Sequence, residues 1–370
     1  MAHAKFLHTA DLHLSRPFGF LPPQLAEDRR RDQRTALTKI ADLAIERKVD
    51  IVLVAGDLFD CPDPDPTDLE AVTKELSRLA ESGKRIFIIP GNHDYAAQNS
   101  FWRRISIEGV RIFLEPEWDS VILEDLGIAV NGIAFDRRKT ERRAFEGLET
   151  PTDLPAIVLA HASHEAFEGQ IERYHPFSVD EISRLKAAYI ALGHYHKLNP
   201  ISSGGAVACY PGTPEGISFD TAETGDRFVV IGEIGDEGKI AIEPVKTNRR
   251  AVKSAEVDCT SFDSQTSLFD AVRKLCEPNA LVELRLTGTP PPEIASMLEE
   301  LPERFRESCL YLALDTSNLS LCGDLPASDL TIRGRFCSHL LHRIEESANP
   351  ERRRLLRRAL EIGVAAFSEE

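Results

Sequence analysis

Histidine, aspartate and asparagine side chains gather in five short segments, and each segment follows a run of apolar residues. Imidazole, carboxylate and amide oxygens together suit Mn²⁺, Fe or Zn²⁺. No cysteine accompanies them, which argues against a structural zinc site. The segments are Asp11-x-His13, Gly56-Asp57, Gly91-Asn92-His93-Asp94, His161 and Gly193-His194-Tyr195-His196.

The number of candidate ligands indicates a pair of ions. Seven ligands exceed what one ion needs if it is to keep a position open for water, and they fit two ions that share a carboxylate. Two ions about 3.5–4 Å apart clamp a phosphoryl group and deprotonate the water between them. The candidates are Asp11, His13, Asp57, Asn92, His161, His194 and His196.

Each segment alone has an ordinary structural explanation. Gly-Asp and Gly-Asn-His sequences are usually turns, and His194 and His196 alone would fit a partly buried pair. His164 lies near His161, but His161 directly follows the apolar run AIVLA, as the other candidates follow theirs. All five segments in this order, each after a buried strand, favour a metal centre over five unrelated turns.

His93 is the expected catalytic side chain that does not bind metal. Its neighbour Asn92 would fix it at the edge of the centre, where an imidazolium protonates or stabilises a departing oxygen. Asp60, three residues after Asp57, is expected to orient His93 and hold it charged. Asp94 is either a supporting residue or a turn residue.

The first 91 residues alternate between strand and helix patterns. Residues 5–10, 50–56 and 85–91 are apolar runs typical of buried strands. Helical periodicity covers residues 24–48, and a second helix, capped by Thr67 or Asp68, runs to about Ser82. This alternation predicts a layered α/β fold.

Later segments predict a hairpin around Leu126-Gly127, strands at 156–162 and 189–193 that end at histidines, and a β-meander over 206–245. Beyond Thr247, strand-like segments alternate with helical stretches at 263–276 and 291–305. We expect three parts, which are a main domain over 1–246, a small α+β domain over 247–335 and a helical tail over 336–370.

The last helix of the tail begins at Asn349-Pro350, a typical helix start. One side of this helix is expected to carry an apolar stripe with arginines beside it. The stripe residues are Leu355, Leu356, Ala359, Leu360 and Ile362.

Composition excludes several classes of protein. A hydrophobic fraction of 42% excludes disorder throughout the chain, and no apolar run is long enough to span a membrane. The N-terminus lacks the apolar core of a secretory signal. Seven scattered cysteines without a CxxC pair favour reduced thiols in a cytoplasmic protein. A net charge of −16 argues against coating nucleic acid by bulk charge, although local basic runs such as Arg29–Arg31 with Arg34 remain available.

The motif order resembles that of the calcineurin-like metallophosphoesterases, and the longer context resembles their SbcD-type DNA repair exonuclease branch. The matching segments are FLHTADLHL (6–14), VDIVLVAGDLFD (49–60), IIPGNHD (88–94), YIALGHYHK (189–197) and YPGTPEG (210–216). The resemblance implies a four-layer α/β/β/α sandwich with a small C-terminal α+β cap domain. It also implies a two-metal nuclease that cleaves DNA phosphodiesters as an exonuclease or endonuclease in DNA repair, most simply with Mn²⁺ and alternatively with Fe or Zn²⁺.

The same resemblance implies the ligand assignment and the partners. Asp57 bridges the two ions, and a homodimer and an SbcC-like coiled-coil ATPase that docks on the tail are expected. The first ion is then held by Asp11, His13, Asp57 and His196, and the second by Asp57, Asn92, His161 and His194.

Two positions depart from this pattern. Many nuclease relatives carry His where this chain has Asp60, whereas phosphatases of the superfamily carry Asp, and Ser15 stands where glycine is common. A phosphatase or phosphodiesterase acting on a substrate other than DNA is therefore the alternative function. A non-catalytic scaffold is disfavoured because it would not need to keep seven ligands and a general acid.

Overall fold

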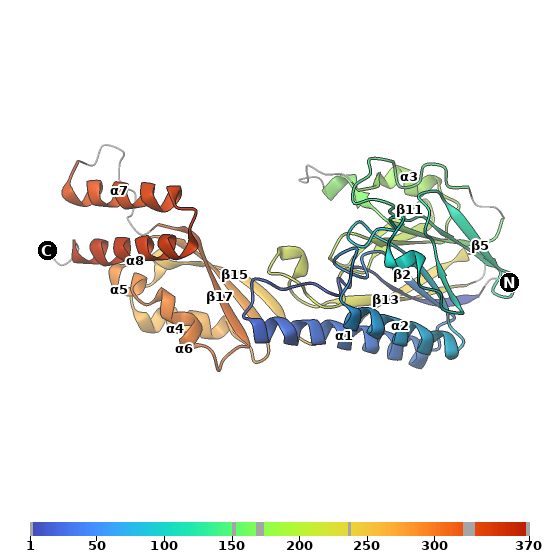
Figure 1. The fold of residues 1–370 in the computed structure, drawn as a ribbon, viewed down its shortest axis with the longest axis horizontal. Coiled ribbons are helices and arrows are strands. Elements are labelled where there is room, and N and C mark those ends of the chain that lie inside the picture. The colour runs from blue at the N-terminus through green and yellow to red at the C-terminus, as the bar shows by residue number, and fades with distance from the viewer. Residues whose placement is uncertain (1–2, 150–152, 168–173, 236–237, 321–329, 368–370) are drawn as a thin grey trace. The chain divides into compact units, whose positions relative to one another are not determined.

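The computed structural model describes residues 3–149, 153–167, 174–235, 238–320 and 330–367. The chain divides into two compact units (Figure 1). The first comprises residues 1–218 and 225–249, and the second comprises residues 219–224 and 250–370. Within the described ranges, no helix is both long and apolar enough to cross a membrane.

Two six-stranded sheets form the first unit. In the first sheet, β1 to β4 are parallel, and two antiparallel strands extend the edge next to β1. Its order is β14 (Ile240–Lys246), β13 (Phe228–Ile234), β1 (Ala4–Thr9), β2 (Ile51–Ala55), β3 (Arg85–Ile89) and β4 (Val110–Ile112).

The second sheet has a parallel centre and an antiparallel strand at each edge. The hairpin predicted around Leu126-Gly127 is confirmed, because β5 and β6 pair antiparallel on either side of it. The order is β11 (Asn199–Ser203), β12 (Ala206–Tyr210), β10 (Tyr189–Gly193), β7 (Ala156–His161), β6 (Ile128–Gly132) and β5 (Asp119–Leu123).

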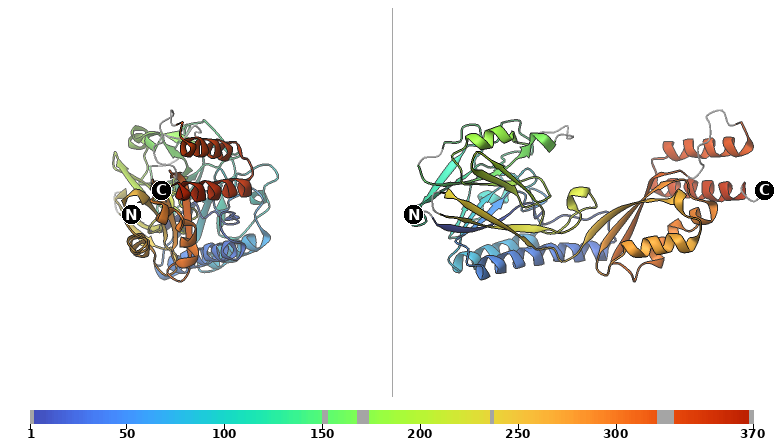
Figure 2. Two further views of the ribbon diagram at one scale, coloured as in Figure 1. Left: turned by 90° about the vertical axis from the view of Figure 1, so that its left-hand side faces the viewer. Right: turned by 180° about the vertical axis from the view of Figure 1, so that it is seen from behind.

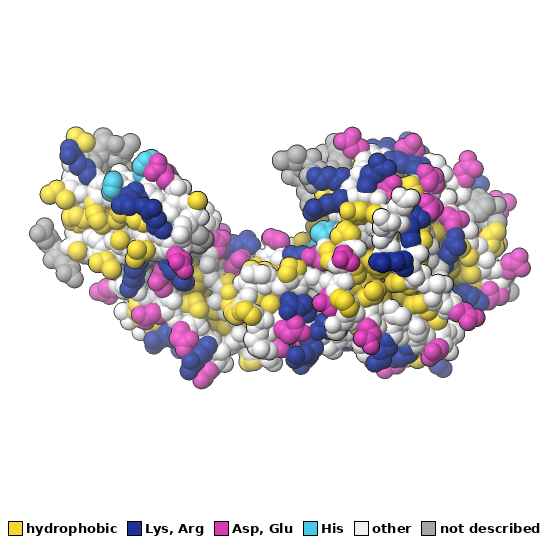
Figure 3. All heavy atoms as spheres, viewed as in Figure 1, with side chains coloured by type: hydrophobic (Ala, Val, Ile, Leu, Met, Phe, Trp, Pro, Cys, Tyr) yellow, Lys and Arg dark blue, Asp and Glu magenta, His cyan; other side chains and the backbone are white. Residues whose placement is uncertain are grey.

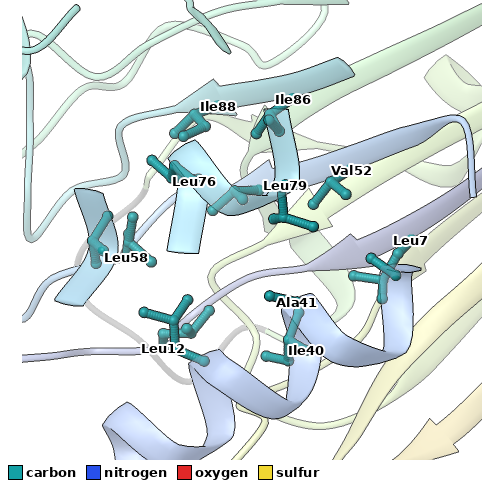
Figure 4. Packing of buried hydrophobic residues seen from close by; sticks show 14 of the residues in the cluster. Leu7, Leu12, Ile40, Ala41, Val52, Leu58, Leu76, Leu79, Ile86 and Ile88 are labelled. Atoms are coloured by element: carbon teal, nitrogen blue, oxygen red, sulfur yellow. The ribbon is translucent and has the colours of Figure 1, made fainter. Parts of the chain in front are cut away.

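Successive residues of the first sheet alternate between two hydrophobic cores, as the period of a strand requires. Leu7, Val52 and Ile88 belong to the cluster that also contains residues of helices α1 (Pro23–Glu46) and α2 (Pro66–Glu81) (Figure 4). Their strand neighbours, including Phe6, Leu53 and Phe87, pack with residues of the second sheet.

The outer face of the second sheet packs Val158 and Ile190 with Ile182 of the short helix α3 (Val179–Arg184). Helix α3 lies on the side of the unit opposite α1 and α2 (Figures 1 and 2). The predicted four-layer α/β/β/α arrangement is therefore confirmed for this unit.

The N-cap prediction for α2 is wrong. Asp65 caps the helix, because its side chain accepts a hydrogen bond from the backbone N–H of Thr67 at 2.8 Å. Pro66 takes the first helical position, where its missing N–H costs nothing.

The second unit contains a parallel three-stranded sheet. Its strands are β15 (Val252–Asp258), β16 (Leu281–Gly288) and β17 (Tyr311–Leu319), and α4 (Gln265–Leu275) fits the predicted helix at 263–276. The predicted helix at 291–305 is broken into α5 (Pro292–Ala295) and α6 (Leu301–Arg304). A continuous helix would require a backbone N–H from Pro302, which has none.

Helices α7 (Ile332–Glu346) and α8 (Pro350–Ala366) pack against each other in the second unit. The prediction of one apolar side on the tail helix is wrong in part. Leu356 and Leu360 are buried, whereas Leu355 and Ile362 are 70% and 60% exposed. The buried stripe repeats every four residues, and Leu355, one residue before Leu356, is turned away from it.

The described cysteines, which are Cys61, Cys209, Cys259, Cys276, Cys309 and Cys337, are free thiols. Cys322 lies outside the described residues.

Candidate metal centre

The seven predicted ligands meet at the carboxyl ends of strands from both sheets. Asp11, Asp57 and Asn92 follow β1, β2 and β3 of the first sheet. His161 ends β7 and His194 follows β10 of the second sheet. Asp11, His13, Asp57, Asn92 and His161 are buried, and His194 and His196 are partly buried.

One group of ligand atoms comes from Asp11, His13 and His196, whose nearest donor atoms lie within 4.8 Å of one another. The Nε2 atoms of His13 and His196 are 3.1 Å apart. The carboxylate of Asp11 accepts hydrogen bonds from the backbone N–H of His194 at 3.0 and 3.1 Å, which holds the β10 loop against β1.

A second group surrounds Asn92. Its Oδ1 lies 3.0 Å from Nε2 of His161 and 3.1 Å from Nδ1 of His194. Asp57 lies between the two groups, because its Oδ2 is 3.3 Å from Nε2 of His161 and 3.8 Å from Nε2 of His13. This position is the one that a bridging carboxylate needs.

These donors fit divalent cations. Two ring nitrogens that face each other at 3.1 Å, as in His13 and His196, are compatible only with a proton or a cation between them. Nδ1 of His161 contacts the backbone carbonyl of Ala55 at 2.9 Å and therefore donates, so Nε2 is left to bind a metal. Nitrogen and oxygen donors without cysteine suit Mn²⁺, Fe or Zn²⁺.

The pKa values of His161 and Asp57 favour a charged pair, whereas burial lowers the pKa of His194 and raises that of Asp11. Burial lowers the pKa of His161, but the negative charge of Asp57 and its hydrogen bond outweigh burial and raise that pKa to about 9. Burial raises the pKa of Asp57, but His161 and His13 more than reverse this and leave the pKa below its usual value. Without metal, a proton on His161 supplies charge that cations supply in a loaded centre.

Asp60 faces a different histidine from the one expected. Its Oδ1 lies 2.9 Å from Nδ1 of His13 but 3.7 Å from Nδ1 of His93. His93 instead contacts Asp60 through the backbone, with Nδ1 3.2 Å from the carbonyl oxygen. The Asp60 carboxylate therefore orients a candidate metal ligand, and its backbone orients the candidate acid.

His93 lies as close to the candidate ligands as they lie to one another. Its nearest donor atom and those of His13 and Asp57 lie within 4.8 Å of one another. The backbone N–H of His93 donates to Oδ1 of Asp57 at 2.8 Å. Burial lowers the pKa of His93, and its side chain remains 32% exposed.

Asp94 supports the loops of the centre, which decides between the two roles left open by the sequence. Its carboxylate accepts hydrogen bonds from the backbone N–H groups of Leu58, Phe59 and Gly91 at 3.0, 3.2 and 2.7 Å. One buried side chain thus ties the loop of Asp57 to the loop of Asn92.

Close backbone packing explains the motif glycine before His194. A Cβ on Gly193 would lie 1.9 Å from the carbonyl oxygen of Ala55 and 2.7 Å from Nδ1 of His161. The backbone is also unusual at the ligands themselves, since Asp11, His13 and Asp57 have φ near +50° (53°, 48° and 49°). Such conformations persist where the surroundings enforce them, as at functional sites.

His164 lies apart from these groups and packs against the ring of Phe177 at 5.2 Å between centroids. Tyr174, which no sequence pattern indicated, lies with its ring centroid 4.9 Å from that of His194. Because Tyr174 stands outside any motif, nothing in the sequence indicated that it lies beside His194.

The model of the calcineurin-like phosphoesterase family matches residues 4–198, more than half of the chain. The chain therefore belongs to the calcineurin-like phosphoesterase family and is a metallophosphoesterase. This family uses a dinuclear metal site, and the groups around Asp57 are the corresponding candidate ligands here.

Among curated proteins, the chain is similar to the uncharacterized metallophosphoesterase YhaO of Bacillus subtilis, with 31% identity over 301 residues that cover 77% of this chain and 72% of that protein. It is 28% identical to the SbcD component of the nuclease SbcCD of B. subtilis, covering 59% of this chain and 63% of that one. It is 28% identical to the DNA double-strand break repair protein Mre11 of Aeropyrum pernix, covering 73% and 66%. The alignments span slightly less than two thirds of the SbcD and Mre11 proteins. The resemblance to the SbcD-type branch that the sequence motifs indicated is confirmed.

Proposed function

We propose that this metallophosphoesterase is a two-metal nuclease that hydrolyses DNA phosphodiesters. The observation that carries the proposal is the convergence of seven donors from two sheets around Asp57. Similarity to a nuclease component and to a DNA double-strand break repair protein supports DNA as the substrate.

The proposed ligand sets follow the two groups of contacts. Asp57 is shared, Mn²⁺ is the proposed metal, and Fe and Zn²⁺ are the alternatives. When bound, two such ions neutralise phosphoryl oxygens and lower the pKa of water. The first set is Asp11, His13, Asp57 and His196, and the second is Asp57, Asn92, His161 and His194.

His93 is the proposed general acid. A carbonyl oxygen only accepts hydrogen bonds, so the contact with Asp60 places a proton on Nδ1 of His93. When the ring is charged, its second proton is on Nε2 and is available for the departing oxygen of the substrate. The backbone contact with Asp57 keeps the ring beside the ligands.

The basic run on α1 does not contribute a free phosphate-binding track. Arg29 is buried and contacts Asp32 and Glu215, each at 3.0 Å. Arg34 pairs with Asp68 at 2.8 Å and with Glu27 at 3.0 Å. We therefore assign phosphate binding chiefly to the metal centre.

A phosphatase or phosphodiesterase for a smaller substrate is the second candidate. It is favoured by Asp60, which matches the superfamily's phosphatases, and by a net charge of −16, which repels a DNA duplex. A comparison of Mn²⁺-dependent cleavage of duplex DNA ends and of p-nitrophenyl phosphate separates the two. We expect cleavage of DNA, and cleavage of the small ester alone would establish the alternative.

We propose that α8 docks on a coiled-coil ATPase of the SbcC type, the partner expected from the resemblance. Leu355 and Ile362 are 70% and 60% exposed and lie seven residues apart, which places them on one face of the helix. Arginines and apolar side chains lie together over α7 and α8 (Figure 3). The free thiols of the described cysteines fit a cytoplasmic location for this complex.

Substitution of both exposed residues tests this docking site. Leu355→Glu with Ile362→Glu should abolish co-purification with the ATPase and leave phosphoesterase activity unchanged, because neither side chain belongs to the core between α7 and α8. Ile122→Glu is the control, because Ile122 is an apolar residue of β5 that is 44% exposed and lies outside α8. Undiminished co-purification of the double variant would reject α8 as the docking site.

A further inference from the structure

Hydrogen bonds of the Ser15 side chain link the turn after His13 to the beginning of α2. Ser15 has φ +68° in this turn, in the region that glycine favours, and its hydroxyl offsets the strain with two hydrogen bonds. The hydroxyl donates to Oδ2 of Asp68 at 2.8 Å and accepts from the backbone N–H of Asp65 at 3.0 Å. The turn therefore holds Arg16, the next residue, in a defined place.

Arg16 contacts Asp60. Its Nη1 donates to Oδ1 of Asp60 at 3.0 Å, and the same oxygen accepts from Nδ1 of His13 at 2.9 Å. Backbone contacts fix the rest of Asp60, because its N–H donates to the carbonyl of Leu14 at 2.8 Å. With both donors on one oxygen, the carboxylate has one preferred orientation.

That orientation directs the carboxylate to His13 and not to His93. Nδ1 of His93 is 3.7 Å from the same Oδ1, beyond hydrogen-bond distance, and lies 3.2 Å from the backbone carbonyl oxygen of Asp60 instead. The guanidinium of Arg16 holds Oδ1 beside His13 through its own hydrogen bond. Arg16 side-chain exposure is 28% and that of Asp60 is 15%, so water weakens the pair only in part.

The contact between Asp60 and His13 determines how His13 presents its ring. Nδ1 carries the proton that is donated to Asp60, which leaves the lone pair of Nε2 directed at His196 and Asp57. In other proteins, removal of a carboxylate that hydrogen-bonds to a metal-binding histidine typically lowers metal affinity or activity by about 10- to 100-fold.

We propose that Arg16 is a positioning residue of the metal centre, which acts through Asp60 to orient His13. The inference rests on the proposed ligand role of His13, but it does not depend on DNA being the substrate. It assigns a role to a residue outside the family motifs, next to the position where serine replaces glycine.

The test is a calorimetric titration of the chelator-stripped full chain with Mn²⁺ alone. Arg16→Met should weaken binding at one of the two sites by about 10-fold, and Arg16→Lys, which keeps a donor, should lose less than about threefold. Arg111→Met is the matched control, because Arg111 pairs with Asp119 at the surface and should leave both affinities unchanged. Mn²⁺ affinities of Arg16→Met equal to wild type would overturn the proposal.

A double-variant cycle tests whether Arg16 acts through Asp60. Asp60→Asn should weaken Mn²⁺ binding as much as Arg16→Met, and the double variant should be no weaker than either single variant. Additive losses would show that Arg16 does not act through Asp60.

A kinetic measurement separates positioning from direct substrate binding. With p-nitrophenyl phosphate at fixed Mn²⁺, Arg16→Met should lower kcat and leave KM within about twofold. A raised KM with unchanged kcat would make Arg16 a substrate-binding residue and overturn the proposal. Failure to cleave DNA would contradict the proposed nuclease function. It would not affect the proposal for Arg16, which is tested by the Mn²⁺ titrations.

Discussion

Asp60 shows how a residue's neighbours decide its chemistry. Its place three residues after Asp57 indicated a role beside the metal centre, and the sequence favoured His93 as its partner. The folded loop turns the carboxylate to His13 and the backbone carbonyl to His93. A difference of 0.8 Å between two side-chain distances, 2.9 and 3.7 Å, is set by the path of the loop and is not encoded in residue spacing.

Replacement of His93 tests its role as general acid. His93→Ala should lower kcat by about 10²- to 10⁴-fold, the usual contribution of proton transfer, and should leave two Mn²⁺ ions bound. The measurements are steady-state kinetics and metal analysis of the same sample. Loss of an ion would make His93 a ligand, which its distance from His13 and Asp57 also permits. Asp57→Ala is the contrasting variant, because removal of the shared carboxylate should weaken both sites.

The central strands were predictable because burial of apolar side chains dominates their formation. The buried strands β2 and β3 consist mainly of apolar, branched residues, and the polar residues that follow them lie at the candidate centre. Prediction failed where local backbone effects, such as a proline or a choice between caps, competed with hydrophobic periodicity. Pro302 divided the helix expected at 291–305, and Asp65 displaced Thr67 and Asp68 as the cap of α2.

The end of β10 is the element most sensitive to added volume. Gly193→Ala would place a Cβ 1.9 Å from the carbonyl of Ala55, which belongs to β2 of the other sheet. We expect a destabilisation of about 1–3 kcal/mol, measured by urea unfolding, since backbone cannot move aside cheaply. Mn²⁺ binding should also weaken, because the same Cβ approaches His161.

Gly19→Ala provides the control for this substitution. No atom lies within 4 Å of a Cβ at Gly19, so its free energy of unfolding should change by less than about 0.5 kcal/mol. Equal effects of the two substitutions would show that the contact of Gly193 with Ala55 does not limit stability.

At the scale of the whole molecule, the motifs predicted residues that the structure brings together at the candidate centre, but not how the sheets meet there. The contact of His13 with His196 joins residues 183 positions apart. It depends on the core between the sheets, in which Phe6, Phe87 and Tyr189 pack. Exposed faces were harder to predict, as Leu355 and Ile362 show, because periodicity alone does not say which side a neighbouring helix covers.

Acid should destabilise the fold through His8. The ring is fully buried, contacts the hydroxyl of Tyr189 at 2.9 Å, and has its pKa lowered by burial to about 3. Between pH 6.5 and 3, His8 is protonated in the unfolded chain but neutral in the folded chain. The free energy of unfolding therefore falls as pH falls. Replacement by Gln removes this titration and keeps a hydrogen-bonding side chain.

Urea unfolding in EDTA at pH 6.5 and pH 5 measures the difference. Wild type should lose about 1.6 kcal/mol more than His8→Gln over this interval, because the unfolded ring is half protonated at pH 6.5 and each full proton counts about 1.36 kcal/mol per pH unit. His175, whose pKa burial lowers to about 4, titrates in the same direction in both proteins and cancels from the comparison. Parallel losses in the two proteins would contradict the assignment to His8.

Because Asp11, Asp57 and Asn92 come from one sheet and His161 and His194 from the other, any ion bound among them is also a cross-link through the interior. Metal bound there should therefore also stabilise the packing of the two sheets. We expect a metal-free chain to separate more readily between its two six-stranded sheets, and its lifetime against proteases to increase as the centre is filled.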